Sequence, residues 1–354
     1  MIEKLFSLGG LFRLAILVAV SALPAAAADG IADFYKGKQM RVVVGSEPGG
    51  GYDLYARLVA QHLGRFIPGN PTFIVQNQPG AGSITAANLT YVQLPQDGTV
   101  IVALQASALF EQMTGNPAAQ FEAGKFHWLG SLNSEPGIAV TWHGSKIRTF
   151  DDLVKEPSNF GTSGPNVTEQ YSSLLIHLTG AKIKQIAGYP SATATYLPIE
   201  RGELDGLTSS WGSIKASNPH WIRENKVNLL VQFALTKQPD IPNVPLILDL
   251  LTDKYLAPGY RSEEANAIWR IVLTQQSMAR PYGLGPGVST DRVAALRKAF
   301  KEMAQDKEFL AQAEKQKRDI SLFDGETVQK LILDAAKTPK ATLEKVDVVT
   351  KPKQ

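Results

Sequence analysis

The chain has 354 residues, a net charge of +3 and no cysteine. Its hydrophobic content of 44% and charged content of 19% are ordinary for a globular protein. The basic residues are scattered and do not form patches, which argues against nucleic-acid binding. Without cysteine, disulfides, Cys-ligated metals and thiol catalysis are excluded, so stability must come from packing.

The N-terminus has the layout of a cleavable export signal. Lys4 and Arg13 supply positive charge, residues 11–20 are almost wholly apolar, and residues 21–28 are rich in small side chains. The apolar run is shorter than the about 20 residues that a membrane helix needs, so an uncleaved anchor is the weaker alternative. We expect cleavage near Ala28 and a mature chain long enough for two domains.

Three strand–helix units are predicted in the first hundred residues of the mature chain. Residues 40–45 read as a buried strand, followed by glycines and by a helix over 53–66 with one apolar face. A short strand at 73–76 precedes a small-residue helix at 84–91, and 99–104 is the third strand. This alternation predicts an α/β fold with a mostly parallel sheet.

A second series begins near residue 138. Thr149 opens a short helix with a capping box, and Pro198 should shorten or kink a later helix. A further helix is predicted at 168–178. The predicted strands of this series lie at residues 138–141, 184–187, 204–208 and 228–235.

The remaining chain is mainly helical, with apolar faces in the segments around 265–272, 290–303 and 325–346. The chain is expected to leave its first lobe near residue 132 and to return near 235–240. Two such crossings make a hinge that can close two lobes on a ligand. The predicted boundaries are 1–28 for the signal peptide, 29–134 with 238–354 for lobe 1, and 135–237 for lobe 2.

The residue patterns of common catalytic and metal sites are absent from the sequence. The five histidines lack metal-ligand spacing, and the glycine run at 49–51 is not followed by the Gly-Lys-Ser/Thr of a P-loop. Residues 161–164 do not form a nucleophile elbow. We therefore predict a protein without enzymatic activity, metal or cofactor. An exported hydrolase using Ser163 or Ser107 is the alternative.

Three polar or glycine-rich turns lie between a strand and a helix, at residues 46–53, 105–107 and 162–168. Ligands of open α/β sheets bind at this edge. A helix start offers unpaired N–H groups and partial positive charge, so it can hold a carboxylate. The candidate ligand-binding residues are Ser46, Gly49, Gly50, Gly51, Tyr52, Ser107, Thr162, Ser163, Asn166 and Asp205.

Each of these features also has a plain structural interpretation, because glycine-rich turns and Ser/Thr caps commonly serve only as turns and caps. We favour Asp53 as a helix-start residue over a ligand contact. Asp205 either faces the cleft or ends a strand. Trp211 either stacks on a ligand or fills the lobe interface.

An ordered series of motifs covers nearly the whole mature chain. It consists of VVV at 42–44, GGGYDLYARL at 49–58, VQNQPGAG at 75–82, PQDGT at 95–99, GTSG at 161–164, YP at 189–190, GELD at 202–205 and PDIPNVP at 239–245. This series resembles the receptors of tripartite tricarboxylate transporters, the TctC or Bug family of periplasmic solute-binding proteins.

We expect a monomer in the periplasm. The resemblance implies a type II periplasmic-binding-protein fold, in which two lobes flank a hinge and a central cleft. It also implies that residues 49–51 grip a ligand carboxylate, often through water, opposite Thr162 and Ser163. The implied partners are the membrane subunits of a transporter. The expected ligand is a small organic acid, aromatic or dicarboxylic.

Three departures from the family pattern leave the ligand open. Ser46 and Glu47 stand where a small apolar stretch is usual, and an ionised Glu47 facing the pocket would repel a carboxylate. Tyr52 replaces a small hydroxyl residue. Residues 262–276 look like an inserted helix. A receptor of the same fold that serves a sensor kinase is the second interpretation of the sequence.

Overall fold

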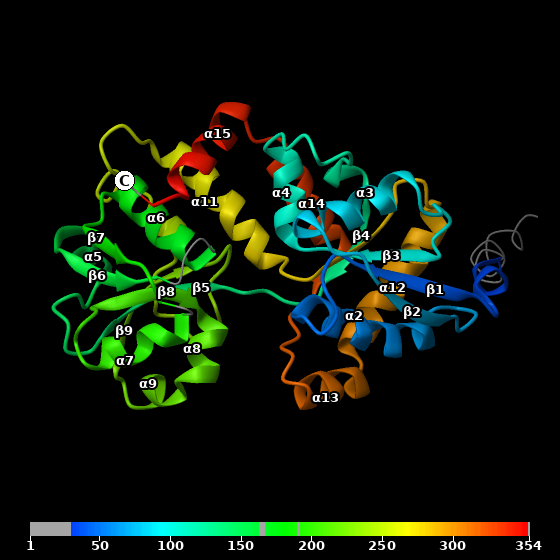
Figure 1. Cartoon of the computed structure of the whole chain (residues 1–354), viewed down its shortest axis with the longest axis horizontal. Helices are drawn as coiled ribbons and strands as arrows, with labels where there is room; N and C mark the ends of the chain where they lie inside the picture. Colours follow the sequence, from blue (N-terminus) through cyan, green and yellow to red (C-terminus); the bar gives the residue numbers. More distant parts are fainter. Residues whose placement is uncertain (1–29, 163–166, 190–191, 353–354) are drawn as a thin grey trace, which may run out of the picture.

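The structure is a computed structural model that describes residues 30–162, 167–189 and 192–352. The chain forms two lobes, each built around its own β-sheet (Figure 1). Lobe 1 has a six-stranded sheet in the order β11-β4-β10-β3-β1-β2, and lobe 2 has a five-stranded sheet in the order β7-β6-β8-β5-β9. The predicted two-lobed α/β architecture is therefore confirmed.

The sheet of lobe 1 combines a parallel part with an antiparallel part, so the prediction of a mostly parallel sheet is wrong. β1 pairs in parallel with both β2 and β3, whereas β10 runs antiparallel between β3 and β4. Because β10 comes from the later part of the chain, this sheet is completed only after lobe 2. The strands are β1 (Gln39–Val44), β2 (Thr72–Asn77), β3 (Val100–Ala103), β4 (His127–Ser131), β10 (Pro281–Leu284) and β11 (Phe323–Asp324).

Helices cover both faces of this sheet, which explains why β1 is a nearly continuous apolar run. Side chains alternate along a strand, and accordingly Val43 belongs to the apolar cluster that includes α3, α4 and α14, while Val42 and Val44 belong to the cluster that includes α2 and α12. The helices of lobe 1 are α2 (Gly51–His62), α3 (Ile84–Val92), α4 (Ala106–Met113), α12 (Thr290–Gln305), α13 (Lys307–Lys315) and α14 (Gly325–Ala336), with short 3-10 turns at Leu63–Phe66, Ala81–Ser83 and Ala123–Lys125.

Lobe 2 repeats this plan on a smaller scale. The predicted capping box at Thr149 is confirmed, since its side chain and that of Asp152 bond reciprocally to the helix start. The helix containing Pro198 is only five residues long, as expected. The elements are β5 (Gly137–Trp142), α5 (Phe150–Lys155), β6 (Ser158–Gly161), α6 (Val167–Thr179), β7 (Ile183–Ile186), a 3-10 turn (Ala192–Thr195), α7 (Tyr196–Glu200), β8 (Gly206–Ser210), α8 (Trp211–Ser217), α9 (Pro219–Arg223), β9 (Val227–Phe233) and α10 (Ile247–Leu250).

Two chain segments cross between the lobes and bond to each other. Residues 132–136 lead from β4 to β5, and residues 278–280 lead from α11 (Ser262–Ser277) to β10. The amide of Leu132 donates to the carbonyl of Arg280 over 3.1 Å, and the amide of Glu135 donates to the carbonyl of Gln276 over 2.9 Å. These paired segments form the hinge.

The second crossing comes later than the predicted return near residue 238. Ile241 and Val244 pack in the core of lobe 2, and Trp269 of α11 stacks on Phe233 of β9 with ring centroids 5.2 Å apart. The segment 262–276, which the sequence suggested is an inserted helix, forms α11, the helix that runs between the lobes. α15 (Lys340–Val349) also packs there, against α6 and α11.

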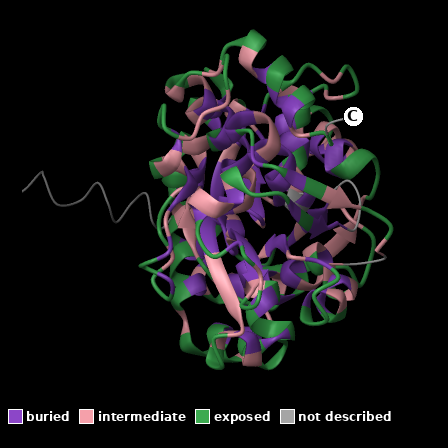
Figure 2. Cartoon of the chain, turned by 90° about the vertical axis from the view of Figure 1, so that its left-hand side faces the viewer, coloured by how far each residue is buried: buried purple, intermediate pink, exposed green. Residues whose placement is uncertain are grey.

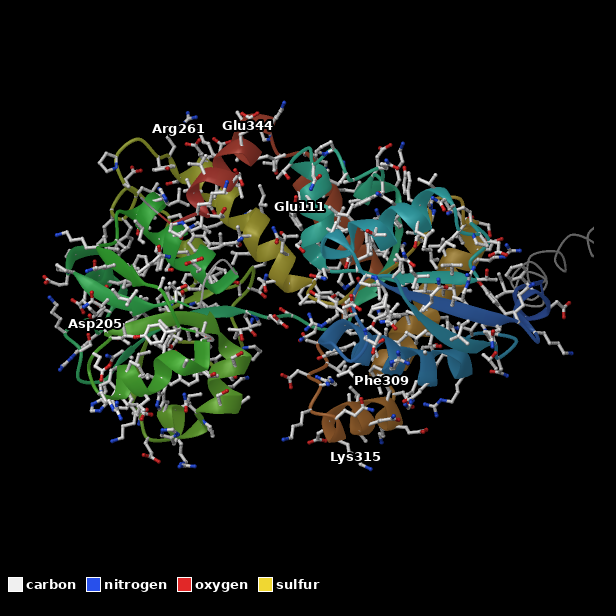
Figure 3. The ribbon with its side chains drawn as sticks, in the orientation of Figure 1. Glu111, Asp205, Arg261, Phe309, Lys315 and Glu344 are labelled. Atoms are coloured by element: carbon white, nitrogen blue, oxygen red, sulfur yellow. The ribbon has the colours of Figure 1, made fainter. Side chains whose placement is uncertain are left out.

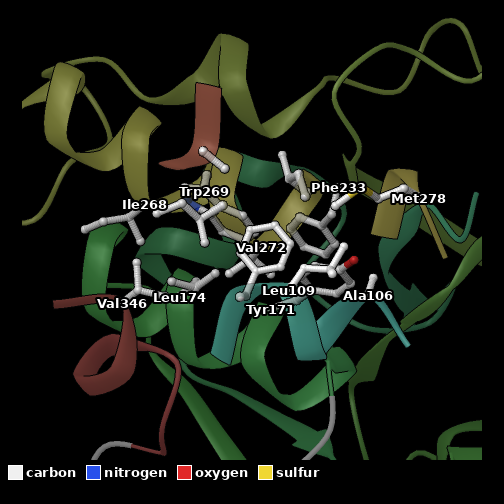
Figure 4. Packing of buried hydrophobic residues seen from close by; sticks show 14 of the residues in the cluster. Ala106, Leu109, Tyr171, Leu174, Phe233, Ile268, Trp269, Val272, Met278 and Val346 are labelled. Atoms are coloured by element: carbon white, nitrogen blue, oxygen red, sulfur yellow. The ribbon is translucent and has the colours of Figure 1, made fainter. Parts of the chain in front are cut away.

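An apolar cluster joins the lobes through α11. Tyr171 of α6, Phe233 and Trp269 form a stack, and Leu109 of α4 and Val346 of α15 belong to the same cluster (Figure 4). Burial is greatest where the sheets meet their helices, and the exposed segments are peripheral turns and helix faces (Figure 2). This cluster fixes one side of the lobe junction.

Candidate functional site

The loops that the sequence singled out in lobe 1 meet at one edge of its sheet. The amide of Gly45, after β1, donates to Ala103 at the end of β3, and the amide of Leu104 donates to Pro281 at the start of β10. The carboxyl ends of β1 and β3 therefore border the hinge, since Arg280 immediately precedes β10. This is the edge at which open α/β sheets bind ligands.

The glycine loop, residues 46–52, forms an exposed part of this edge. Gly49 has φ +79°, a conformation that glycine adopts without strain, and Gly50 is the extended N-cap of α2. The loop residues 47–51 are exposed, Glu47 among them. The first amides of α2 have no partner within the helix, so the loop presents N–H groups and the positive end of the helix dipole.

Asp53 holds this loop from beneath, because its buried carboxylate accepts three hydrogen bonds. Oδ2 accepts from the amide of Gly49 at 2.8 Å and from Arg57 Nε at 2.9 Å, while Oδ1 accepts from Asn77 Nδ2 at 2.8 Å. Asn77 also donates to the Ser46 carbonyl. Burial raises the pKa of Asp53, but these hydrogen bonds outweigh burial and hold the pKa below its ordinary value. Asp53 is thus a helix-start residue that positions the loop, as the sequence favoured.

Ser83 ties the glycine loop to the neighbouring loops. Residues 80–83 all have positive φ, which places the Ser83 hydroxyl between two strand ends. The hydroxyl donates to the Gly45 carbonyl at 2.7 Å and accepts from the amide of Gln105 at 3.1 Å. A Cβ on Gly45 would overlap the Ser83 side chain, so this close approach requires glycine. The sequence indicated a turn here but not its bridging role.

Ser107 lies at the junction between the lobes. It is exposed in the first turn of α4 and lines a cavity of about 890 Å³ together with Gln170 of lobe 2. Glu111 of α4 and Glu344 of α15 also line this cavity, and both are labelled in Figure 3. Ser107 is therefore accessible from the space between the lobes.

Of the predicted site residues in lobe 2, Thr162 is described by the structure and lies near the hinge. Thr162 follows the carboxyl end of β6 and is buried, and its hydroxyl donates to Glu169 Oε1 at 3.1 Å. Ser163 and Asn166 lie outside the described residues. The carboxyl end of β6 points the same way as that of β8, after which the Trp211 amide donates to Pro136 in the hinge. The Thr162 edge of lobe 2 therefore also borders the hinge.

Asp205 is not brought to this edge. It precedes β8, and its carbonyl accepts from the amide of Trp142, at the end of β5 farthest from the hinge. Its carboxylate accepts from the Ser145 hydroxyl and the Asn159 amide, at the outer side of lobe 2 (Figure 3). Of the two interpretations of Asp205, the structure shows a residue that ends a strand, and its place in the predicted site is corrected.

Trp211 fills the core of lobe 2. It is buried and packs with Ile138 and Ile214, and its Nε1 donates to Asp240 Oδ2 at 2.8 Å. Its outer edge lines a smaller cavity of about 390 Å³ between the lobes, which also includes Glu135. The contacts of Trp211 are those of a packing residue, but in the core of lobe 2 and not at the lobe interface that the sequence analysis suggested.

Arg280 is a residue of this edge that the sequence did not single out. Its guanidinium carbon lies 4.4 Å from the ring centre of Tyr52 and 5.2 Å from that of Tyr55, and Nη2 lies 3.1 Å from Glu135 Oε1. Burial raises the pKa of the Tyr52 hydroxyl, and the Arg280 charge opposes this rise. Because Arg280 is distant from the glycine loop in sequence, no local motif connects the two.

Two kinds of feature are not found in the described part of the chain. Residues 30–162, 167–189 and 192–352 contain no group of three His, Asp or Glu side chains placed to hold a metal ion. None of the helices in the same ranges combines the length and the apolar character of a membrane span. The predicted signal peptide lies outside the described residues.

Comparison with known proteins gives matches along most of the chain. No model of a known protein family matches it. A UPF0065 protein of Bordetella bronchiseptica is 25% identical over 265 residues, which are 72% of each chain. A TctC solute binding protein from Polaromonas, solved without ligand, has a TM-score of 0.68 at 17% identity and covers 88% of this chain and 99% of its own.

Two further solved structures are similar. Periplasmic binding protein BugD has a TM-score of 0.51 at 14% identity, over 89% of this chain and 98% of its own. A protein of R. palustris solved with adipate has a TM-score of 0.50 at 15% identity, over 88% of this chain and 97% of its own. The resemblance that the motifs indicated is thereby confirmed, and the chain has the fold of the TctC and Bug solute-binding proteins.

Proposed function

We propose that this protein is a periplasmic solute-binding receptor that captures a small organic carboxylate between its two lobes. The observation that carries the proposal is the glycine loop, whose exposed residues lead into the N-terminus of α2 and are held in place by Asp53. Backbone N–H groups at a helix start bind anions without a basic side chain. The loop borders the hinge, where closure of the lobes would enclose a ligand.

In the proposed site, Ser46, Gly49, Gly50, Gly51 and Tyr52 hold the near end of the ligand. Thr162, Ser163 and Asn166 would hold its far end, and Ser107 would line the floor. Asp205 is left out because of its position at the opposite end of β8. The R. palustris neighbour solved with adipate supports a carboxylate as the ligand class.

The proposed partners are the membrane subunits of a tripartite transporter, to which a loaded receptor would deliver its ligand. A receptor of the same fold that serves a sensor kinase is the second candidate. Co-purification of the ligand-loaded protein with transporter membrane subunits, and not with a kinase ectodomain, would support the first candidate.

Isothermal titration calorimetry and thermal-shift measurements on the mature protein test the ligand class. The probes are adipate, succinate and benzoate, with glucose and putrescine as uncharged and cationic controls. We expect at least one acid to bind and to raise the melting temperature, since a ligand that binds only the folded state stabilises it. Stabilisation by glucose or putrescine alone would overturn the proposal.

The proposed receptor has no enzymatic activity. The alternative, an exported serine hydrolase, requires turnover of model esters that is lost when Ser163 or Ser107 is replaced by alanine. We expect no turnover above the buffer rate with either p-nitrophenyl acetate or p-nitrophenyl butyrate. Serine-dependent turnover would replace the receptor proposal with the hydrolase.

A further inference from the structure

Arg280 places a positive charge directly beneath the glycine loop. A Cβ added to Gly51 would lie 3.5 Å from Arg280 Nη2, so the guanidinium lies close to the first residue of α2. The side chain is only 15% exposed. The guanidinium charge and the N-terminus of α2 therefore act on the same space with the same sign.

Two tyrosines of α2 keep this guanidinium in place. Tyr52 and Tyr55 lie one helical turn apart, and both rings lie within cation–π distance of Arg280. Arg280 Nη1 donates to the carbonyl of Ala279 over 2.7 Å, and this hydrogen bond fixes one edge of the guanidinium plane. Arg280 Nε is buried and has no hydrogen-bond partner within the described ranges. The donor capacity of this side chain is thus only partly used.

Glu135 is the one carboxylate that bonds to Arg280 among the described residues, and its side chain is the more exposed partner of the pair. Its side chain is 38% exposed, and it is attached to the crossing segment that leads into lobe 2. A single exposed carboxylate neutralises the guanidinium but leaves the helix N-terminus uncompensated. A ligand carboxylate entering from the cleft would be attracted by the Arg280 guanidinium and by the N-terminus of α2. It would compete with Glu135 for the guanidinium.

We propose that Arg280 is the cationic group that receives the carboxylate of the ligand, and that Glu135 occupies it until the ligand arrives. This inference rests on the proposed function and adds the side chain that selects anionic ligands. In the ligand-bound protein, Arg280 would donate to the ligand carboxylate, and Glu135 would move toward solvent with the segment that carries it. Arg280 and Glu135 thereby affect affinity in opposite directions.

Opposite effects of two substitutions test this arrangement. Calorimetric titration with adipate, succinate and benzoate is performed on the mature wild type, R280Q, R280K and E135Q. We expect R280Q to weaken binding of the acid at least about tenfold, as loss of a hydrogen bond to a charged group does. We expect R280K to retain part of the affinity, because it keeps the charge but not the planar fork. We expect E135Q to tighten binding at least about threefold, because it removes a competing carboxylate.

Arg297 provides a matched control. It is 21% exposed, is paired with Glu326 and donates to the carbonyl of Trp128, so R297Q removes the same charge at similar burial but away from the hinge. We expect R297Q to bind the acid like the wild type. Thermal unfolding of each variant checks that it is folded.

Three outcomes are distinct. Unchanged affinity in R280Q would overturn the role of Arg280 while leaving the receptor proposal intact. Weaker binding in both R280Q and E135Q would mean that the ion pair acts only as a structural link in the hinge. If the wild type binds none of the three acids, the proposed function and this inference both fail. If R280Q does not fold, E135Q alone decides: tighter binding of the acid supports the proposed role of Arg280, and unchanged or weaker binding overturns it.

Discussion

The Asp53 carboxylate lies 2.8 Å from the amide of Gly49 and reaches back over the turn that opens α2. The contact resembles the second half of a capping box, in which a side chain of the first helical turn accepts from the residue before the helix. It links the conformation of an exposed glycine loop to a buried charge. The stability of the protein should therefore depend on the ionisation of this group.

We expect D53N to lower the free energy of unfolding by about 1–3 kcal/mol, because buried donors lose an ionised acceptor. The pKa of Asp53 is below its ordinary value, so its contribution is present above the unfolded-state pKa of about 3.9 and is lost as pH falls through the lower folded-state pKa. Urea unfolding between pH 7 and pH 3 should show a smaller loss of stability for D53N than for the wild type. An equal loss of unfolding free energy on acidification in both proteins would contradict this prediction. D253N, at an exposed loop position, is the control and should behave like the wild type.

Gly49 and Gly50 should respond differently to a side chain. Gly50 has φ −74° and space for a Cβ, so we expect G50V to weaken ligand binding with little loss of stability. Gly49 has φ +79°, so G49A should cost about 1–3 kcal/mol of unfolding free energy. Calorimetric titration and chemical unfolding separate the two effects. Unchanged affinity in G50V would mean that the binding site lies elsewhere.

We expect S83A to lower stability by about 1–3 kcal/mol, because the Gly45 carbonyl and the Gln105 amide both lose their partner in a buried position. Ligand affinity should also fall, since these bonds set the spacing of two loops of the proposed site. Urea unfolding and titration with the bound acid measure both effects. S46A, which removes a hydroxyl whose recorded contact is a weak one at 3.5 Å, should leave stability near the wild-type value.

Gly137 begins β5 directly after the hinge, and a Cβ there would overlap the ring of Tyr171. Because Tyr171 is stacked on Phe233 with centroids 4.5 Å apart, the ring cannot move aside without disturbing the apolar cluster. We expect G137A to cost about 1–3 kcal/mol by overpacking. At Gly144 the atom nearest to an added Cβ would be 3.6 Å away, so G144A should be nearly neutral. Thermal unfolding of both variants measures the difference.

The position of the glycine loop could be predicted from sequence because it depends on local rules. A buried strand, three glycines and an amphipathic helix follow one another, and the geometry of parallel sheets puts such a turn at the binding edge. The same reasoning predicted most strands of both lobes. It also favoured Asp53 as a helix-start residue, which its hydrogen bond to Gly49 bears out.

The features that sequence reasoning missed depend on contacts between distant segments. β10 is four residues long and contains proline and glycine, so it carries no clear strand pattern, and the return to lobe 1 was placed too early. Arg280 gains its surroundings only when β10 inserts beside β3, which brings it to Tyr52. Asp205 lies next to a strand end both as a cleft residue and as a residue that ends a strand. Only the direction of β8 in the sheet decides whether that end borders the hinge or the outer side of lobe 2.

The insertion of β10 between β3 and β4 also determines when lobe 1 can be completed. A ribosome or export channel releases residues 39–131 long before residues 281–284, so the two halves of this sheet remain unjoined until nearly the whole chain has emerged. Such late, long-range pairing slows folding. For the proposed periplasmic receptor, this late completion of the sheet would keep the chain unfolded long enough to pass through an export channel.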